Sequence, residues 1–196
     1  MDREYKRIDP NTMKRIRFEN IVDVGLTASA MIRLFAKGTK EGKLRPRTVE
    51  ALEQIFKAES EQEFRIVHSR FCQWGASEVA LARKNKLASY GQIAKTFNVV
   101  LKVAVYYCHL PECEKSKELS KWLHAAVDNR MMAKLLRKQY PLGMKRWPRT
   151  IEGVDRPKYE EIQEIVKKFI REVNEDSIIP VQFDDYYWRE LKYGTH

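Results

Sequence analysis

The stretch that decides the fold is Leu87–His109, LASYGQIAKTFNVVLKVAVYYCH. Apart from Asn98 and Lys102, its second half up to the final Cys-His pair is apolar. A helix that is apolar on every side lies in the middle of a domain. We therefore predict a central buried helix here. Lys95 stands near its beginning, where a buried ammonium is costly unless it is paired or used in chemistry.

A second segment, His124–Leu136 (HAAVDNRMMAKLL), contains a candidate partner for this lysine. Asp128 follows an apolar approach, is of a residue type favoured at helix N-caps, and precedes a helical pattern of apolar residues. We predict that its carboxylate and the Lys95 amine lie at the rim of one cavity. On the residues alone, a structural ion pair or an ordinary N-cap is the commoner explanation of such a pair.

The sequence KTFNVVL (95–101), followed by AVD (126–128), resembles the helix-hairpin-helix DNA glycosylase superfamily. In that superfamily a K-T-A-N-x-V-L helix follows the hairpin, and a V-D segment carries the catalytic aspartate. The resemblance covers about the middle quarter of the chain. It implies a helix-hairpin-helix-like core at 77–140, with Lys95 as nucleophile and Asp128 as its helper. The long interval between the two is similar to that of the archaeal 8-oxoguanine glycosylase branch.

The segment before the lysine departs from the superfamily pattern. Members carry a hairpin like L-P-G-V-G, whereas Leu87–Ala94 has one glycine, Gly91, and no proline. The tight turn that would aim backbone amides at a DNA phosphate is therefore only half specified. The chain also lacks the four-cysteine cluster that holds an iron–sulfur centre in some members.

The chain also resembles a group of proteins of uncharacterised activity. Their core reads Y-G-Q-x-x-K-x-x-N-x-x-L-K, which matches Tyr90–Lys102, and a later H-x-x-x-D matches His124–Asp128. This second resemblance implies no particular chemistry.

Composition and charge are typical of one globular domain with an anionic partner. The 196 residues are 43% hydrophobic and 33% charged, enough for a substantial core. No apolar run approaches the roughly 18 residues of a membrane span, and Met1–Arg7 lacks the apolar core of a signal peptide. Three scattered cysteines fit a reducing compartment. We predict a cytoplasmic protein, nucleoid-associated if it binds DNA, without membrane contact.

The net charge of +10 favours nucleic acid, and the resemblance implies damaged double-stranded DNA. Predicted contacts come from the basic turn before the hairpin, the hairpin, the starts of the central helices and a cationic-aromatic patch. These residues are Lys84, Lys86, Tyr90, Gly91, Gln92, Lys102, Arg130, Arg146 and Trp147. The alternatives are an exposed charged turn and, for the patch, a tryptophan that covers the core from outside.

Aromatic residues of the C-terminal segment are candidates for a base pocket. Tyr187 and Trp188 offer faces on which a flipped base can stack, although such residues more often pack against the core. Lys102, further along the same helix, is the substitute nucleophile if the alignment has slipped. Metal-ligand residue types occur at Cys108, His109, Cys113 and His124, but their spacing matches no common zinc pattern, so no metal or cofactor is predicted.

These observations predict an all-α, compact, two-lobed domain over residues 1–196, of helix-hairpin-helix DNA glycosylase type. The expected function is base excision repair by a DNA glycosylase, with AP lyase activity through a lysine Schiff base. A non-catalytic nucleic-acid-binding protein on the same fold is the alternative, and a protein-interaction module is a third class. A monomer is assumed, and the sequence does not identify the lesion.

Overall fold

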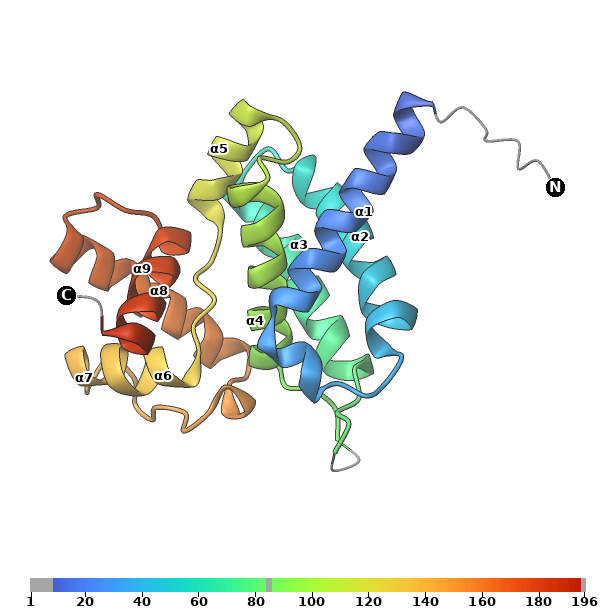
Figure 1. The fold of residues 1–196 in the computed structure, drawn as a ribbon. Helices are drawn as coiled ribbons and strands as arrows, with labels where there is room; N and C mark the ends of the chain where they lie inside the picture. The colour runs from blue at the N-terminus through green and yellow to red at the C-terminus, as the bar shows by residue number, and fades with distance from the viewer. Residues whose placement is uncertain (1–8, 84–85, 195–196) are drawn as a thin grey trace.

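The structure is a computed structural model that describes residues 9–83 and 86–194, and these are largely helical (Figure 1). Within these residues there is no strand, only two isolated β-bridges. The predicted all-α class is therefore confirmed. The α-helices are α1 (Pro10–Ala28), α2 (Arg45–Phe56), α3 (Glu61–Glu78), α4 (Tyr90–Leu101), α5 (Cys113–Trp122), α6 (Asn129–Met131), α7 (Arg137–Gln139), α8 (Arg156–Asn174) and α9 (Pro180–Tyr193). The 3-10 and π segments are η1 (Ala30–Leu34), η2 (Lys40–Leu44), η3 (Lys102–Tyr107), η4 (Met132–Leu136) and η5 (Ile151–Gly153).

The central buried helix predicted from the sequence is α4, which continues into η3. Ile93, Phe97 and Val100 on α4 are fully buried. Figure 1 shows α1, α2 and α3 on one side of α4, and α6 to α9 on the other. Because the buried apolar side chains of both sides form one continuous cluster, α4 is shared by the two halves of the core.

Polar side chains cap the starts of several helices. Ser60 accepts a hydrogen bond from the Glu63 amide at the start of α3. Asp155 caps α8 by accepting from the Lys158 amide. None of the helices described between residues 9 and 194 combines the length and apolar character needed to cross a membrane.

The segment before Lys95 is not the tight hairpin that the sequence suggested. The chain leaves α3 after Glu78 and enters α4 at Tyr90, and a β-bridge between Ala80 and Leu87 holds the connection. This difference arises because strand-like pairing closes the connection, where a glycine turn was expected. A helix-hairpin-helix core within 77–140 therefore remains a proposal.

The first turn of α4 uses its backbone amides within the protein. The Gly91 amide donates to the Val154 carbonyl at 2.9 Å. Ser89 and Gln92 form a reciprocal capping box, with the Gln92 amide donating to Ser89 Oγ at 3.2 Å. Since these amides are already bonded, they are not presented to a DNA phosphate. The prediction that the Gly91 amide binds a DNA phosphate is therefore wrong.

Gly91 instead allows η5 to approach α4. A Cβ at this position would lie 2.6 Å from Val154 Cβ and 2.7 Å from the Ile151 carbonyl oxygen. We expect Gly91→Ala to lower the free energy of unfolding by about 2–3 kcal/mol, because the backbone must move to relieve the overlap. Urea unfolding measures this loss.

Gly42→Ala is the matched control, because a Cβ at Gly42 would meet nothing within 4 Å. We expect that variant to be neutral or more stable by less than about 1 kcal/mol. Equal destabilisation by the two substitutions would contradict the packing role assigned to Gly91.

Candidate functional site

The structure brings Lys95 and Asp128 to one cavity. Lys95 Nζ lies 3.7 Å from Asp128 Oδ2, and the two side chains keep 13% and 19% of their surface exposed. The cavity holds about 400 Å³ and lies where η1, α4, α6, η5 and α9 meet. Its lining residues are Met31, Lys95, Asp128, Asn129, Arg130, Ile151, Trp188 and Lys192.

Asp128 is held by the helix that it caps, as the sequence predicted. Its Oδ1 accepts hydrogen bonds from the amides of Arg130 and Met131, both at 2.9 Å. Because one oxygen is fixed by two backbone donors, the other keeps a constant direction towards Lys95. The carboxylate is therefore oriented before any ligand arrives.

Lys95 is partly buried, and its amine makes no close hydrogen bond to Asp128. The distance of 3.7 Å is longer than a normal hydrogen bond. Burial lowers the pKa of Lys95 below the ordinary 10.5, although the nearby Asp128 and Asp184 carboxylates oppose this effect. A larger fraction of neutral amine is therefore present than at an exposed lysine.

Lys102 does not fit either role predicted for it. Its amine donates to the Asp184 carboxylate and, at 2.9 Å, to Asp185 Oδ1. Burial alone would lower the pKa of Lys102, but the two carboxylates outweigh burial and raise it. An amine that is so strongly paired is a poor nucleophile and a poor phosphate ligand. The sequence did not reveal this pairing because the aspartates lie on α9, far along the chain.

Lys102→Met is expected to leave Asp184 and Asp185 without their cation. Asp184 is 3% exposed, so its unpaired carboxylate is costly. We expect a loss of about 2–3 kcal/mol in the free energy of unfolding, measured by urea denaturation. The double variant Lys102→Met/Asp184→Leu should recover part of this loss. If the double variant recovers none of the lost stability, the unpaired Asp184 carboxylate is not the cause of the loss.

The structure places some of the other predicted DNA contacts on the surface and others in the interior. Arg130 is exposed and lines the cavity, and Lys86 and Arg146 are exposed. Tyr90, Gly91 and Gln92 are buried by α4 packing, so the prediction that they contact DNA is wrong. Lys84 lies outside the described residues.

The two predicted aromatic sites also differ from expectation. Trp147 is half-buried against the core, and its Nε1 donates to the Tyr140 carbonyl, which favours the alternative that it covers the core. Tyr187 packs on Phe169 and Phe183 and does not line the cavity, so its predicted place in a base pocket is wrong. The cause is the helical period of α9, which points neighbouring residues in different directions.

Trp188 does line the Lys95 cavity, at 38% exposure. The Lys192 amine lies 4.5 Å from the centre of its indole ring. Sequence reasoning missed Lys192, although its spacing of four residues from Trp188 on a helix would have placed both on one face.

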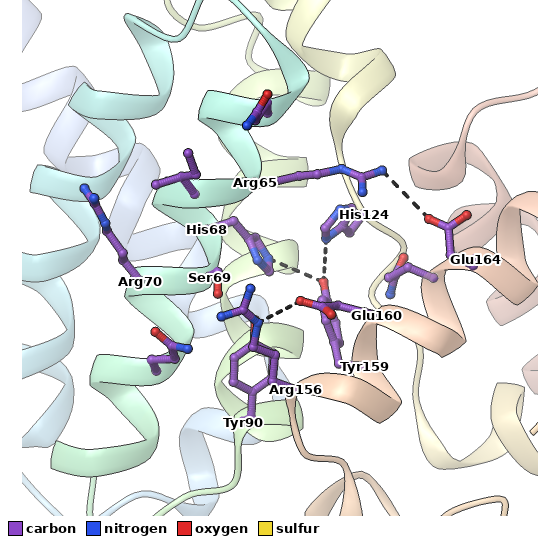
Figure 2. A pocket seen from close by; sticks show the side chains of 14 residues that line it. Arg65, His68, Ser69, Arg70, Tyr90, His124, Arg156, Tyr159, Glu160 and Glu164 are labelled. Carbon is purple, nitrogen blue, oxygen red and sulfur yellow. Dashed lines mark hydrogen bonds and ion pairs between the residues drawn. The ribbon is translucent and has the colours of Figure 1, made fainter. Parts of the chain in front are cut away.

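A larger cavity of about 700 Å³ lies between α3 and α8 (Figure 2). Beneath it, His68 and His124 both meet the hydroxyl of Tyr159, at 3.4 and 2.8 Å. Asn98 joins this network, since its Oδ1 lies 2.8 Å from His68 Nε2. The sequence signals for this network were Asn98, a polar residue in a largely apolar helix, and His124, the histidine of the H-x-x-x-D pattern.

The buried histidines make stability depend on pH. Burial lowers the pKa of His68 to about 4, and burial and neighbouring cations also lower the pKa of His124. Between about pH 6.5 and pH 4 the unfolded chain binds a proton that native His68 does not, so stability falls as pH falls. From about pH 7.5 to pH 5.5 we expect each imidazole to cost roughly 1 kcal/mol in urea unfolding.

His68→Gln should reduce this slope, whereas His109→Gln at an exposed position should not. An unchanged slope in the His68 variant would contradict its neutral burial.

Within the described residues, no three His, Cys, Asp or Glu side chains are grouped so that they could hold a metal ion. Comparison of the chain with protein-family models, curated proteins and solved structures finds no match.

Proposed function

We propose that the Lys95 cavity is the catalytic site of a DNA glycosylase with AP lyase activity that acts on damaged double-stranded DNA. The observation that carries this proposal is the separation of 3.7 Å between an amine of lowered pKa and a fixed carboxylate in one cavity. Perturbed, partly buried ionisable pairs in a cavity are a common feature of catalytic sites.

The pair supplies the groups that base excision needs. The neutral Lys95 amine attacks the sugar C1′ while the bond from C1′ to the base breaks, and the base leaves with the bonding electrons. Asp128 accepts the proton that the attacking nitrogen loses, and its charge stabilises the cationic sugar before that. The C1′–O4′ bond then breaks, O4′ takes the proton that Asp128 holds, and the opened sugar carries a protonated imine at C1′. Transfer of a C2′ proton to the Asp128 carboxylate then expels the 3′ phosphate and cleaves the strand.

The rim of the cavity suits a nucleic acid. Arg130 and Lys192 place cations beside the pair, where a DNA backbone would need them. Trp188 offers part of an indole face at the same cavity, which suits a base turned out of the stack. The net charge of +10 adds long-range attraction to DNA.

Borohydride trapping tests the proposal. The protein is incubated with a duplex that contains one abasic site, with borohydride to reduce any imine to a stable amine. We expect a covalent complex with this duplex and none with an intact duplex. Salt-sensitive binding without a complex would point to a non-catalytic nucleic-acid-binding protein. No binding to DNA at moderate salt would contradict both the glycosylase and the non-catalytic nucleic-acid-binding protein.

A further inference from the structure

A further cavity, of about 370 Å³, lies where η1 meets the connection from α3 to α4. Its lining residues are Arg33, Leu34, Leu81, Arg83, Gln92 and Glu152. Backbone hydrogen bonds hold the two segments together: the Ala36 amide donates to the Ala80 carbonyl, and the Ala82 amide to the Leu34 carbonyl, both at 2.8 Å. In Figure 1 this connection projects from the end of the molecule where α4 begins.

This backbone pairing brings two arginines together. Phe35 lies opposite Leu81 in an antiparallel bridge. Because the two segments run in opposite directions, Arg33 and Arg83 are each two residues beyond the bridge, at the same end of it. Both are exposed, and both line the cavity. Neighbouring like charges repel each other, and a bound anion would relieve that repulsion.

Neither arginine is neutralised by a carboxylate. Other arginines of this chain are paired: Arg45, for example, contacts Glu19 and Asp23, both at 3.1 Å. Arg33 and Arg83 form no ion pair with any residue that the structure describes.

Glu152 is the carboxylate in the lining, and it is exposed. With one negative charge against the two arginines, the cavity keeps a net positive charge and suits an anion.

The same three elements line this cavity and the Lys95 cavity. η1 contributes Arg33 here and Met31 there, and η5 also lines both. On α4, Gln92 and Lys95 are three residues apart, which places them on one face and about 5 Å apart along the helix axis. A strand that enters the Lys95 cavity therefore passes close to the two arginines.

We propose that Arg33 and Arg83 together bind one phosphodiester group of the DNA strand whose damaged nucleotide lies in the Lys95 cavity. This inference rests on the proposed function, because it takes DNA as the ligand. A guanidinium group carries its donors in a fixed fork that matches two oxygens of a phosphate, so two such groups can hold one phosphodiester from both sides. The contact involves charge and hydrogen bonds only, without covalent change.

Fluorescence anisotropy with the full chain tests this contact. The probe is a duplex with one tetrahydrofuran abasic analogue, which cannot form an imine, so binding is measured without chemistry. We expect Arg33→Gln/Arg83→Gln to bind about tenfold more weakly at about 0.1 M salt. The slope of log Kd against log salt concentration should fall by about one, because one phosphate contact is lost. Both side chains are exposed, so the variant should fold normally, which circular dichroism checks.

Arg137→Gln/Arg171→Gln is the matched control. It removes the same charge at two exposed positions that line neither cavity. We expect it to weaken binding by less than about twofold, through long-range attraction alone.

A neutral methylphosphonate, placed in turn at each phosphate beside the abasic analogue, locates the contact. One position should weaken binding to the unchanged protein by about tenfold. The same position should have no further effect on Arg33→Gln/Arg83→Gln, because both changes remove one contact.

The outcomes separate this contact from the proposed catalysis. Arginine-independent binding together with covalent trapping would overturn this proposal and leave the catalytic one, whereas arginine-dependent binding without trapping would do the reverse. The contact is also overturned if every methylphosphonate keeps its effect in the double variant. If inorganic phosphate alone, titrated by calorimetry, binds through these arginines while DNA does not, the cavity holds free phosphate and the proposal is wrong. Absence of any binding to the duplex would overturn both proposals.

Discussion

Lys95→Gln is expected to lower the yield of borohydride-trapped complex with abasic DNA by roughly 10³-fold or more. Glutamine keeps the length and polarity of the side chain but has no amine that can form an imine. Lys95 is only 13% exposed, so replacing its ammonium by a neutral amide removes the cost of burying a charge. The fold should therefore stay intact, which circular dichroism checks. Gel quantification of the covalent complex measures the loss.

Lys121→Gln is the control for this experiment, because Lys121 is an exposed lysine on α5 outside the cavity. It should trap as the unchanged protein does. Equal trapping by the Lys95 and Lys121 variants would remove Lys95 from the chemistry and leave its pairing with Asp128 as a structural contact.

Asp128→Asn is expected to slow trapping by roughly 10²–10⁴-fold. Asparagine still accepts from the Arg130 and Met131 amides, so the cap of α6 survives while the base is lost. The carboxylate of Asp128 opposes the lowering of the Lys95 pKa, so its removal should lower that pKa further. The rate should therefore rise with pH through an inflection below 10.5 in the unchanged protein and at still lower pH in Asp128→Asn.

Asp128→Ala separates the cap from the chemistry. It should lose the base and also about 1 kcal/mol of stability, because alanine cannot cap the helix. If Asp128→Asn traps DNA at the original rate and with the original pH inflection, the carboxylate has no part in the reaction.

Local signals explain what the sequence predicted well. The central helix was evident because its apolar residues are continuous, and burial of Phe97 and Val100 agrees. The cap at Asp128 was evident because side-chain capping depends on neighbours only two or three residues away. The proximity of Lys95 and Asp128 came from a resemblance, and spacing alone did not predict it.

Contacts between distant segments explain what the sequence did not predict. Gly91 is required by the approach of Val154, and Lys102 is neutralised by Asp184; both partners are more than sixty residues away. The cavity between α3 and α8 depends on His68 and Tyr159, which no local pattern connects. Such sites are formed by tertiary packing and leave no periodic trace in the chain.

Residues of the central helix contribute to two cavities. Lys95 lines the cavity with Asp128, whereas Asn98 supports the network under the larger cavity. In the same way, Asp128 lines the first cavity and His124 lines the second. One helix and one connecting segment therefore position both cavities, so a change in their packing should disturb both.

The most direct test is to identify the lysine that carries the reduced adduct. After trapping on abasic DNA, nuclease and protease digestion followed by mass spectrometry locates the added sugar fragment. We predict that it lies on the peptide that contains Lys95. An adduct on Lys192, on Lys102 or on any other lysine would contradict the role assigned to the Lys95–Asp128 pair.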